Sequence, residues 1–240
     1  MTIKILGING SPRKYGNTYK MLKLALYSAE YLGAKIEIID LYEKRIEPCL
    51  GCLTDNQYAC RYPCVIKDDM QEIYKIILES DGLIFATPVY WFNVSGPMKN
   101  LVDRITVFEN MVYFDEYSWV EGKTAGIIAA GAESGTAMVV SSLMITLNSY
   151  GMMIPPWGFA YFTGKEDVLT DTNAVLDAIN VGRVVYMAIK GEKTSRWYDP
   201  RPSFLEEVLS RVKEECEKNY KELFPGRKEK IFTLLDSEKE

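Results

Sequence analysis

The stretch from residue 10 to residue 18, which reads G-S-P-R-K-Y-G-N-T, constrains the fold of this chain more than any other segment. It follows residues 3–8, a short run rich in branched apolar side chains that predicts a buried strand. It precedes residues 18–32, where apolar side chains recur three and four positions apart, as on one face of an amphipathic helix. The chain therefore opens with a strand, a small polar loop and a helix.

This loop predicts a binding site for a phosphate group. The first amides of a helix have no partner within the helix, and the positive end of the helix dipole favours an anion. Ser11, Asn17 and Thr18 can add side-chain hydrogen bonds, and Arg13 adds a positive charge. The loop lacks the patterns G-x-G-x-x-G and G-x-x-x-x-G-K-[ST], which are typical of dinucleotide and triphosphate sites. We therefore predict a terminal phosphate monoester as the ligand; the alternative is an ordinary loop in which Thr18 only caps the helix.

Composition narrows the class of protein and its partners. A length of 240 residues and a hydrophobic content of 48% suit one large α/β domain with an appendage. A net charge of −5 argues against nucleic acid or an anionic membrane surface as the partner, because both require a basic face. No apolar run reaches about 18 residues and no charged-then-apolar leader opens the chain, so we expect a cytoplasmic protein without a membrane partner.

The chain contains no histidine. This removes the usual general base and the Ser-His-Asp and Cys-His catalytic arrangements. We therefore assign no catalytic side chain and expect a bound cofactor to carry the chemistry, although a chain of this length can also lack histidine by chance.

Strands and helices are predicted to alternate along the chain. After the opening unit, the remaining strands are expected at residues 34–41, 82–87, 124–130 and 152–154, and the remaining helices at 68–79, 97–108, 137–150 and 172–190. This alternation predicts a three-layer α/β fold with a doubly wound, five-stranded parallel sheet. Residues 1–190 would form this domain, and residues 191–240 a C-terminal appendage with a turn at 197–202 and a charged helix to about residue 223.

Three loops are expected at the carboxyl ends of the strands, where doubly wound sheets bind ligands. They are residues 10–17, residues 88–95 and residues 131–136. In the second loop, Tyr90, Trp91 and Phe92 could flank a flat ring, while the amides that follow Pro88 bond to its polar edge. In the third, Gly131 and Gly135 would let the backbone approach a ligand. For the second loop, the alternative is an aromatic plug in the core or at a subunit contact. For the third loop, the alternative is an ordinary glycine turn.

The helix after the aromatic loop carries a charged pair. Lys99 and Asp103 are spaced i, i+4, so we expect a surface ion pair without a catalytic role.

Four cysteines cluster in a loop at residues 43–67. Their spacing is C-x2-C-x7-C-x3-C, whereas Cys216 lies far away in the tail. The clustered residues are Cys49, Cys52, Cys60 and Cys64. Thiolates spaced in this way can hold a 4Fe-4S cluster. One alternative is a zinc ion, although the second cysteine pair of a zinc site is usually C-x2-C. A second is disulfides, which a reducing cytoplasm disfavours, and a third is buried thiols that bind nothing.

Several motifs together give a family resemblance over residues 1–190. They are G-S-P-R-x-x-G-N-T, the P-C-x-x-C segment that leads to C-V-I-K-D-D-M, T-P-V-Y-W, and P-M-K-N-L-V-D-R. The chain resembles the NADPH-dependent FMN reductase-like flavoproteins, and among them most closely the iron–sulfur flavoproteins. The cysteine motif of the iron–sulfur flavoproteins has two residues between the second and third cysteines, whereas this chain has seven.

The resemblance implies a flavodoxin-like sheet of strand order 2-1-3-4-5 and bound FMN. The FMN phosphate would lie on Ser11, Arg13, Asn17 and Thr18. The isoalloxazine ring would lie against residues 131–135 and against Pro88, Val89, Tyr90, Trp91 and Phe92. The resemblance also implies homodimers or homotetramers in which a neighbouring subunit completes the flavin site.

Three functions are consistent with these features. The first is an FMN-dependent oxidoreductase that accepts a hydride from NAD(P)H and passes electrons to a small-molecule substrate or an electron-carrier protein, through a 4Fe-4S cluster if one is present. The second is an electron carrier that a ferredoxin-like partner reduces and that has no NAD(P)H activity of its own. The third is a non-redox scaffold whose loop binds another small anion.

Overall fold

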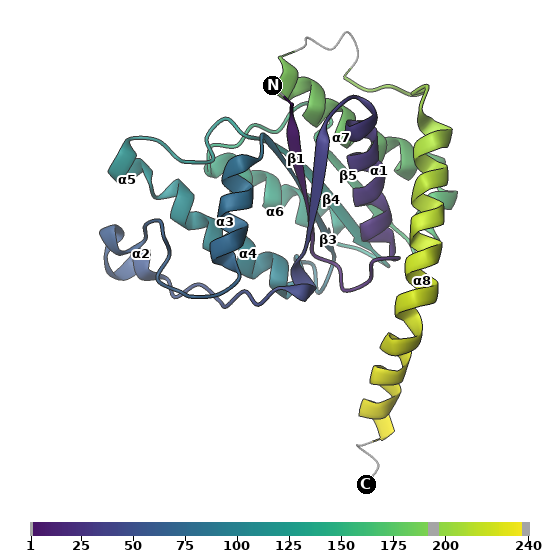
Figure 1. Ribbon diagram of the computed structural model, residues 1–240, viewed down its shortest axis with the longest axis horizontal. Helices are drawn as coiled ribbons and strands as arrows, with labels where there is room; N and C mark the ends of the chain where they lie inside the picture. Colours follow the sequence, from purple (N-terminus) through teal and green to yellow (C-terminus); the bar gives the residue numbers. More distant parts are fainter. Residues whose placement is uncertain (1, 192–196, 237–240) are drawn as a thin grey trace.

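A computed structural model describes residues 2–191 and 197–236. Five strands form one parallel sheet with the order β2-β1-β3-β4-β5, as Figure 1 shows. The strands are β1 (Lys4–Asn9), β2 (Lys35–Asp40), β3 (Gly82–Pro88), β4 (Thr124–Gly131) and β5 (Phe159–Thr163). The predicted parallel sheet and its strand order are confirmed.

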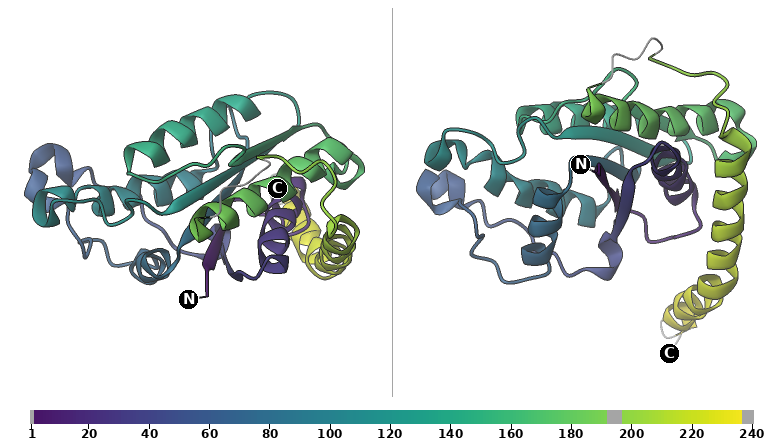
Figure 2. Two further views of the ribbon diagram at one scale, coloured as in Figure 1. Left: turned by 90° about the horizontal axis from the view of Figure 1, so that it is seen from above. Right: turned by 45° about the horizontal axis from the view of Figure 1, so that its top comes forward.

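Helices cover both faces of the sheet, which gives the three layers seen in Figure 2. One face packs against α1 (Asn17–Tyr31) and α7 (Thr172–Lys190). The other packs against α3 (Met70–Glu79), α4 (Gly96–Glu109) and α6 (Thr136–Ser149). Because side chains alternate along a strand, successive residues of β3 belong to the two different cores: Leu83 and Phe85 to one, Ile84 to the other.

Close packing of α1 on α7 depends on a glycine. A Cβ added to Gly182 would lie 1.8 Å from the carbonyl oxygen of Ala25. Only a residue without a side chain fits at this contact.

Short elements complete the body of the molecule. They are η1 (Leu41–Glu43), α2 (Cys52–Asp55), η2 (Gln57–Ala59), α5 (Val112–Asp115) and η3 (Val168–Thr170). The tail forms one long helix, α8 (Leu205–Asp236), which extends beyond the residue at which the predicted helix ends. Figure 1 shows that its first part lies against the body and that its last part projects past the carboxyl edge of the sheet.

The predicted position of the fifth strand is wrong. Met153 forms only an isolated bridge with Thr124, and β5 begins at Phe159. The chain does reach β4 at Met153, whose carbonyl accepts a hydrogen bond from the amide of Ala125 at 2.8 Å. It then leaves at Pro155 and returns at Gly158, whose carbonyl accepts from the amide of Ile127 at 2.9 Å. The edge segment is therefore interrupted, and its longer paired part lies after the turn.

The described residues include no helix with the length and apolar content that a bilayer crossing requires.

Candidate functional site

A cavity of about 430 Å³ opens at the carboxyl ends of the strands. Four loops surround it, and they follow β1, β3, β4 and β5. The predicted residues that line it are Ser11, Arg13, Asn17, Thr18, Pro88, Val89, Tyr90 and Gly131. The structure therefore brings together the three loops that the sequence placed at this edge.

Side-chain hydrogen bonds fix the start of the phosphate loop, which comprises residues 10–18. Asn9 Nδ2 donates to Asp40 Oδ1 at 2.7 Å, and Asn9 Oδ1 accepts from the amide of Ser11 at 3.0 Å. The Ser11 hydroxyl accepts from the amide of Arg13 at 3.2 Å. This arrangement sets the path of the backbone before any ligand binds.

The first turn of α1 presents its amides to the cavity edge. Gly16 is the N-cap residue and no side chain caps the helix, so the alternative role of Thr18 as the cap is wrong. The amide of Lys20 bonds to the carbonyl of Gly16 at 3.0 Å, which leaves the amides that precede it in the turn without an intrahelical partner. An anion can accept hydrogen bonds from these amides and gains from the helix dipole.

The side chain of Asn17 joins two loops. Its Nδ2 donates to the carbonyl of Glu166 at 2.8 Å, and its Oδ1 accepts from the amide of Val168 at 3.1 Å. Its amide side chain therefore ties the phosphate loop to the loop after β5. Asp167 in that loop pairs with Lys20 at 2.8 Å. Burial would raise the pKa of Asp167, but the hydrogen bonds from Lys20 and the amide of Leu169, together with the charges of Lys20 and Lys213, lower it.

The aromatic loop lies beside the cavity, but only its first part lines it. The amide of Val89 donates to the carbonyl of Ala130 at 2.8 Å, and that of Tyr90 donates to Asn93 at 2.9 Å. These two amides are therefore bonded within the protein, contrary to the expectation that they face a ligand. Trp91 and Phe92 do not line the cavity, and the two residues are 94% and 53% exposed.

Backbone strain accompanies this exposure. Trp91 and Phe92 have φ angles of 50° and 62°, in the left-handed region that favours glycine. Gly135, predicted to approach the ligand, lies instead behind Phe92: a Cβ at Gly135 would be 2.9 Å from Phe92 Cδ1. Gly135 thus supports the aromatic loop and does not line the cavity itself.

Sequence reasoning missed one wall of the cavity. Residues 164–167 line it, and so does Tyr15. The loop at 164–167 follows β5, so misplacing that strand hid the loop. The apolar and aromatic run at residues 159–162, bounded by Gly158 and Gly164, was the signal available in the sequence.

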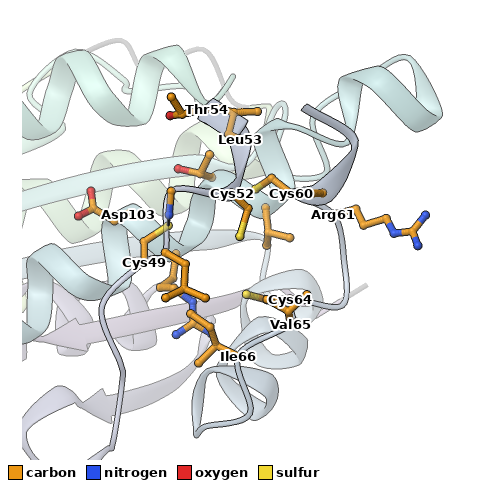
Figure 3. A pocket seen from close by; sticks show the side chains of 16 residues that line it. Cys49, Cys52, Leu53, Thr54, Cys60, Arg61, Cys64, Val65, Ile66 and Asp103 are labelled. Carbon is orange, nitrogen blue, oxygen red and sulfur yellow. Dashed lines mark hydrogen bonds between the residues drawn. The ribbon is translucent and has the colours of Figure 1, made fainter. Parts of the chain in front are cut away.

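The four clustered cysteines line a second cavity, of about 360 Å³. Figure 3 shows the side chains of Cys49, Cys52, Cys60 and Cys64 arranged around a common space. All four are free thiols, so the disulfide alternative is not present. Among the described residues, no three Cys, Asp or Glu side chains converge as the ligands of a single metal ion would.

Burial and the neighbouring sulfurs together raise the pKa of the Cys60 thiol. Burial, with smaller contributions from Cys49, Cys52 and Cys64, raises the pKa of Cys60 to about 11. The thiol is therefore protonated at neutral pH, and a metal that binds there must displace the proton.

The seven-residue spacer between Cys52 and Cys60 folds compactly. It contains η2 and the part of α2 that follows Cys52, two short helical turns that bring the chain back toward the cavity. Asn110, the residue that follows α4, donates to the carbonyls of Gln57 at 2.8 Å and Cys60 at 2.7 Å, and so fixes the end of the spacer.

A buried ion pair supports the rest of the cysteine loop. Arg104 Nη1 and Nη2 lie 2.7 and 3.1 Å from the carboxylate oxygens of Asp68, and Nη1 also donates to the carbonyl of Glu47 at 3.0 Å. Both side chains are at most 1% exposed. Gln71 donates to the carbonyl of Cys64 at 3.1 Å. Sequence reasoning did not find this pair, because the two residues lie on different elements, but the predicted surface pair of Lys99 and Asp103 is present at 2.6 Å.

The two cavities have no lining residue in common. The cysteine loop and α8 lie at opposite ends of the molecule in Figure 1.

Comparison with known proteins relates these sites to a family. The family model for NADPH-dependent FMN reductase matches residues 3–167. An iron–sulfur flavoprotein of Archaeoglobus fulgidus is 37% identical over 159 residues, which cover 66% of this chain and 67% of that protein. The chain spans between half and about two thirds of the length of the first curated relatives it matches.

Solved structures show the same fold. RosB, in its crystal structure with bound 8-demethyl-8-formylriboflavin-5′-phosphate, has a TM-score of 0.66 and 18% identity, covering 89% of this chain and 88% of RosB. A flavodoxin from the domain Archaea has a TM-score of 0.52 and 12% identity, covering 78% of this chain and 99% of that protein. The predicted flavodoxin-like fold is confirmed.

Proposed function

Because the chain belongs to the NADPH-dependent FMN reductase family, we propose that it binds FMN at the carboxyl edge of the sheet and oxidises NAD(P)H. The observation that carries this proposal is the cavity in which the first turn of α1, the end of β3 and the loop after β4 face one another. Its size suits a ligand of a few hundred cubic ångströms. The family model and the named flavoprotein relatives support the choice of flavin.

The protein binds and orients the cofactor in this proposal. The amides of the first turn of α1 hold the phosphate, Arg13 neutralises part of its charge, and Thr18 and Ser11 border it. Pro88, Val89 and Tyr90, with residues 130–132 and 164–167, line the part of the cavity that would hold the ring. Bound FMN supplies a ring that takes up two electrons with a hydride and can pass them on singly. No described side chain is required as an acid or base.

Anaerobic reduction tests the reaction. Protein reconstituted with FMN is mixed with NADPH and, separately, with NADH, and the visible absorbance of the oxidised flavin is followed by stopped flow. We expect at least one of them to bleach the flavin rapidly. If neither does and reduced ferredoxin does, the protein is the electron carrier considered above. If the protein takes up no FMN, the flavin assignment itself is wrong.

We also propose that Cys49, Cys52, Cys60 and Cys64 hold a 4Fe-4S cluster. Their shared cavity, the compact spacer and the hydrogen bonds from Asn110 and Gln71 to the loop support this proposal, as does the similarity to proteins named iron–sulfur flavoproteins. The cysteine loop would hold the cluster on the side of the sheet that α3 and α4 cover.

Iron and sulfide analysis after anaerobic purification tests the cluster. We expect about four iron atoms per chain in the wild type and a large loss in Cys60→Ala. Cys216→Ala is the matched control, because Cys216 is buried in α8 far along the chain from the cluster. Equal iron in all three proteins would contradict the ligand assignment, and stoichiometric zinc in place of iron would contradict the cluster.

We further propose that the protein is a cytoplasmic homodimer or homotetramer. The exposed aromatic side chains of Trp91 and Phe92 beside the cavity support a subunit contact there. Sedimentation velocity at micromolar concentration should show an oligomer that Trp91→Asp weakens. A wild type that sediments as a monomer with FMN bound would contradict the proposal.

A further inference from the structure

The helix α8 lies outside the segment that the family model matches, which ends at residue 167. No site prediction involved it. Nevertheless α8 passes along the phosphate loop, so its contacts there need an explanation.

The first part of α8 is held firmly on the body. Val208, Val212 and Cys216 are buried in the core that α1 and α7 share. Glu215 accepts hydrogen bonds from the hydroxyls of Tyr19, at 3.1 Å, and Tyr27, and it pairs with Lys23 at 3.0 Å. These three partners lie on α1, so the helix is fixed relative to the element that carries the phosphate site.

One turn further on, α8 contacts the phosphate loop directly. Asn219 Nδ2 donates to the carbonyl of Lys14 at 2.9 Å. The side chain of Lys14 points to the other side, where its Nζ lies 2.9 Å from Asp40 and 2.6 Å from Glu43. Lys14 is therefore held by its backbone on α8 and by its side chain on the end of β2.

The neighbouring residue, Tyr15, is held by two aromatic rings of α8. Tyr220 meets the Tyr15 ring edge-on at 5.2 Å between centroids, and Phe224 meets it at 6.4 Å. Tyr220 and Phe224 stack on each other at 4.7 Å. Such pairs contribute specific geometry in addition to burial.

The position of Tyr15 matters because this residue lines two cavities. It lines the flavin cavity, and it also lines a cavity of about 280 Å³ between α1 and α8. The aromatic contacts from α8 thus set a wall of the proposed FMN site, next to the amides that receive the phosphate.

We propose that Asn219, Tyr220 and Phe224 are positioning residues for the flavin phosphate. They hold Lys14 and Tyr15 so that the following amides at the start of α1 face the ligand. The inference rests on the proposed function, because it assumes that FMN binds at this loop. It assigns α8 a role in phosphate binding that reaches beyond packing.

A comparison of two ligands separates positioning from general stability. FMN carries the phosphate and riboflavin does not, and otherwise the two share the same ring and ribityl chain. Dissociation constants for both are measured by quenching of flavin fluorescence, with wild type, Asn219→Ala and the double variant Tyr220→Ala with Phe224→Ala. Lys218→Ala is the matched control on the same helix, because its side chain is 72% exposed and faces Glu222.

We expect Asn219→Ala to weaken FMN binding by about twofold to tenfold, the range that the loss of one hydrogen bond gives, and to leave riboflavin binding unchanged. The double variant should behave in the same way, and Lys218→Ala should match the wild type with both ligands. Equal weakening for FMN and riboflavin, or no weakening for FMN, overturns the inference.

The outcomes also separate this inference from the proposed function. If the wild type binds no FMN, both the proposed function and the role of α8 are contradicted. If the wild type binds FMN and Asn219→Ala binds it equally tightly, only the role of α8 is contradicted. Thermal unfolding of the flavin-free proteins shows whether each variant folds. The ratio of the two dissociation constants is unaffected by an inactive fraction common to both titrations.

Discussion

At the scale of single residues, the pair of Arg104 and Asp68 shows why some of the site could not be predicted from the sequence. Ser11, Arg13 and Thr18 were predictable because neighbours in the chain form the phosphate loop. Asp68 has a local alternative role at the start of α3, where its carboxylate accepts from the amide of Met70. Only the fold shows that Arg104, 36 residues away, meets it in a buried position.

The first prediction concerns this pair. Asp68→Asn leaves the buried guanidinium of Arg104 without its carboxylate, so we expect the free energy of unfolding to fall by about 3–5 kcal/mol. Lys99→Ala removes the exposed pair with Asp103 and should cost less than about 1 kcal/mol. Urea unfolding of the flavin-free proteins measures both. Similar losses for the two variants would show that the buried pair has no special role.

The lowered pKa of the Asp68 carboxylate predicts that the free energy of unfolding depends on pH. Burial would raise the pKa of Asp68, but hydrogen bonds from Arg104 and from the amides of Glu47 and Met70 lower it below 3.8. The unfolded chain therefore binds a proton at higher pH than the folded protein does. The stabilisation is complete well above pH 3.8 and is lost as the pH falls through the lower, folded pKa. Unfolding measured from pH 6 to about pH 3 should show a shallower fall for Asp68→Asn than for the wild type.

At the scale of elements, four of the five strands were predictable: β1, β3 and β4 are apolar runs that end in a turn signal, and β2 alternates polar and apolar residues in part. The fifth was not, because Met153 makes the first contact with β4 and the longer pairing follows only after the turn at Pro155. The loop after β3 shows a similar limit. The sequence indicates three aromatic residues there, but the left-handed backbone at Trp91 and Phe92 turns their side chains out of the cavity.

A glycine substitution tests how this loop is supported. Gly135 has a φ of 89°, and a Cβ there would lie 3.2 Å from Phe92 Cα, so Gly135→Ala should cost about 1–3 kcal/mol and displace the aromatic loop. Gly96→Ala is the control, because its Cβ would meet nothing within 4 Å. Thermal unfolding measures the first effect; the second is measured by the fluorescence of Trp91, obtained as the difference from a Trp91→Phe protein because the chain has four tryptophans. An unchanged Gly135→Ala protein would contradict the supporting role of this residue.

At the scale of the whole molecule, one sheet carries two separate cavities. The loops at its carboxyl edge form one of them, and a loop clamped by α3 and α4 forms the other. The long helix α8 closes the side of the phosphate loop, although no motif in the tail predicted this contact. Doubly wound topology explains the first cavity, whereas the second and the α8 contact depend on segments that the sheet does not specify.

Titration of the flavin-free protein with FMN tests the central claim most directly, since the proposed flavin site and the proposed role of α8 both depend on a phosphate monoester at the start of α1. We predict equimolar binding at micromolar concentrations, with competition by inorganic phosphate. A protein that leaves the fluorescence of added FMN unchanged at these concentrations would contradict the account.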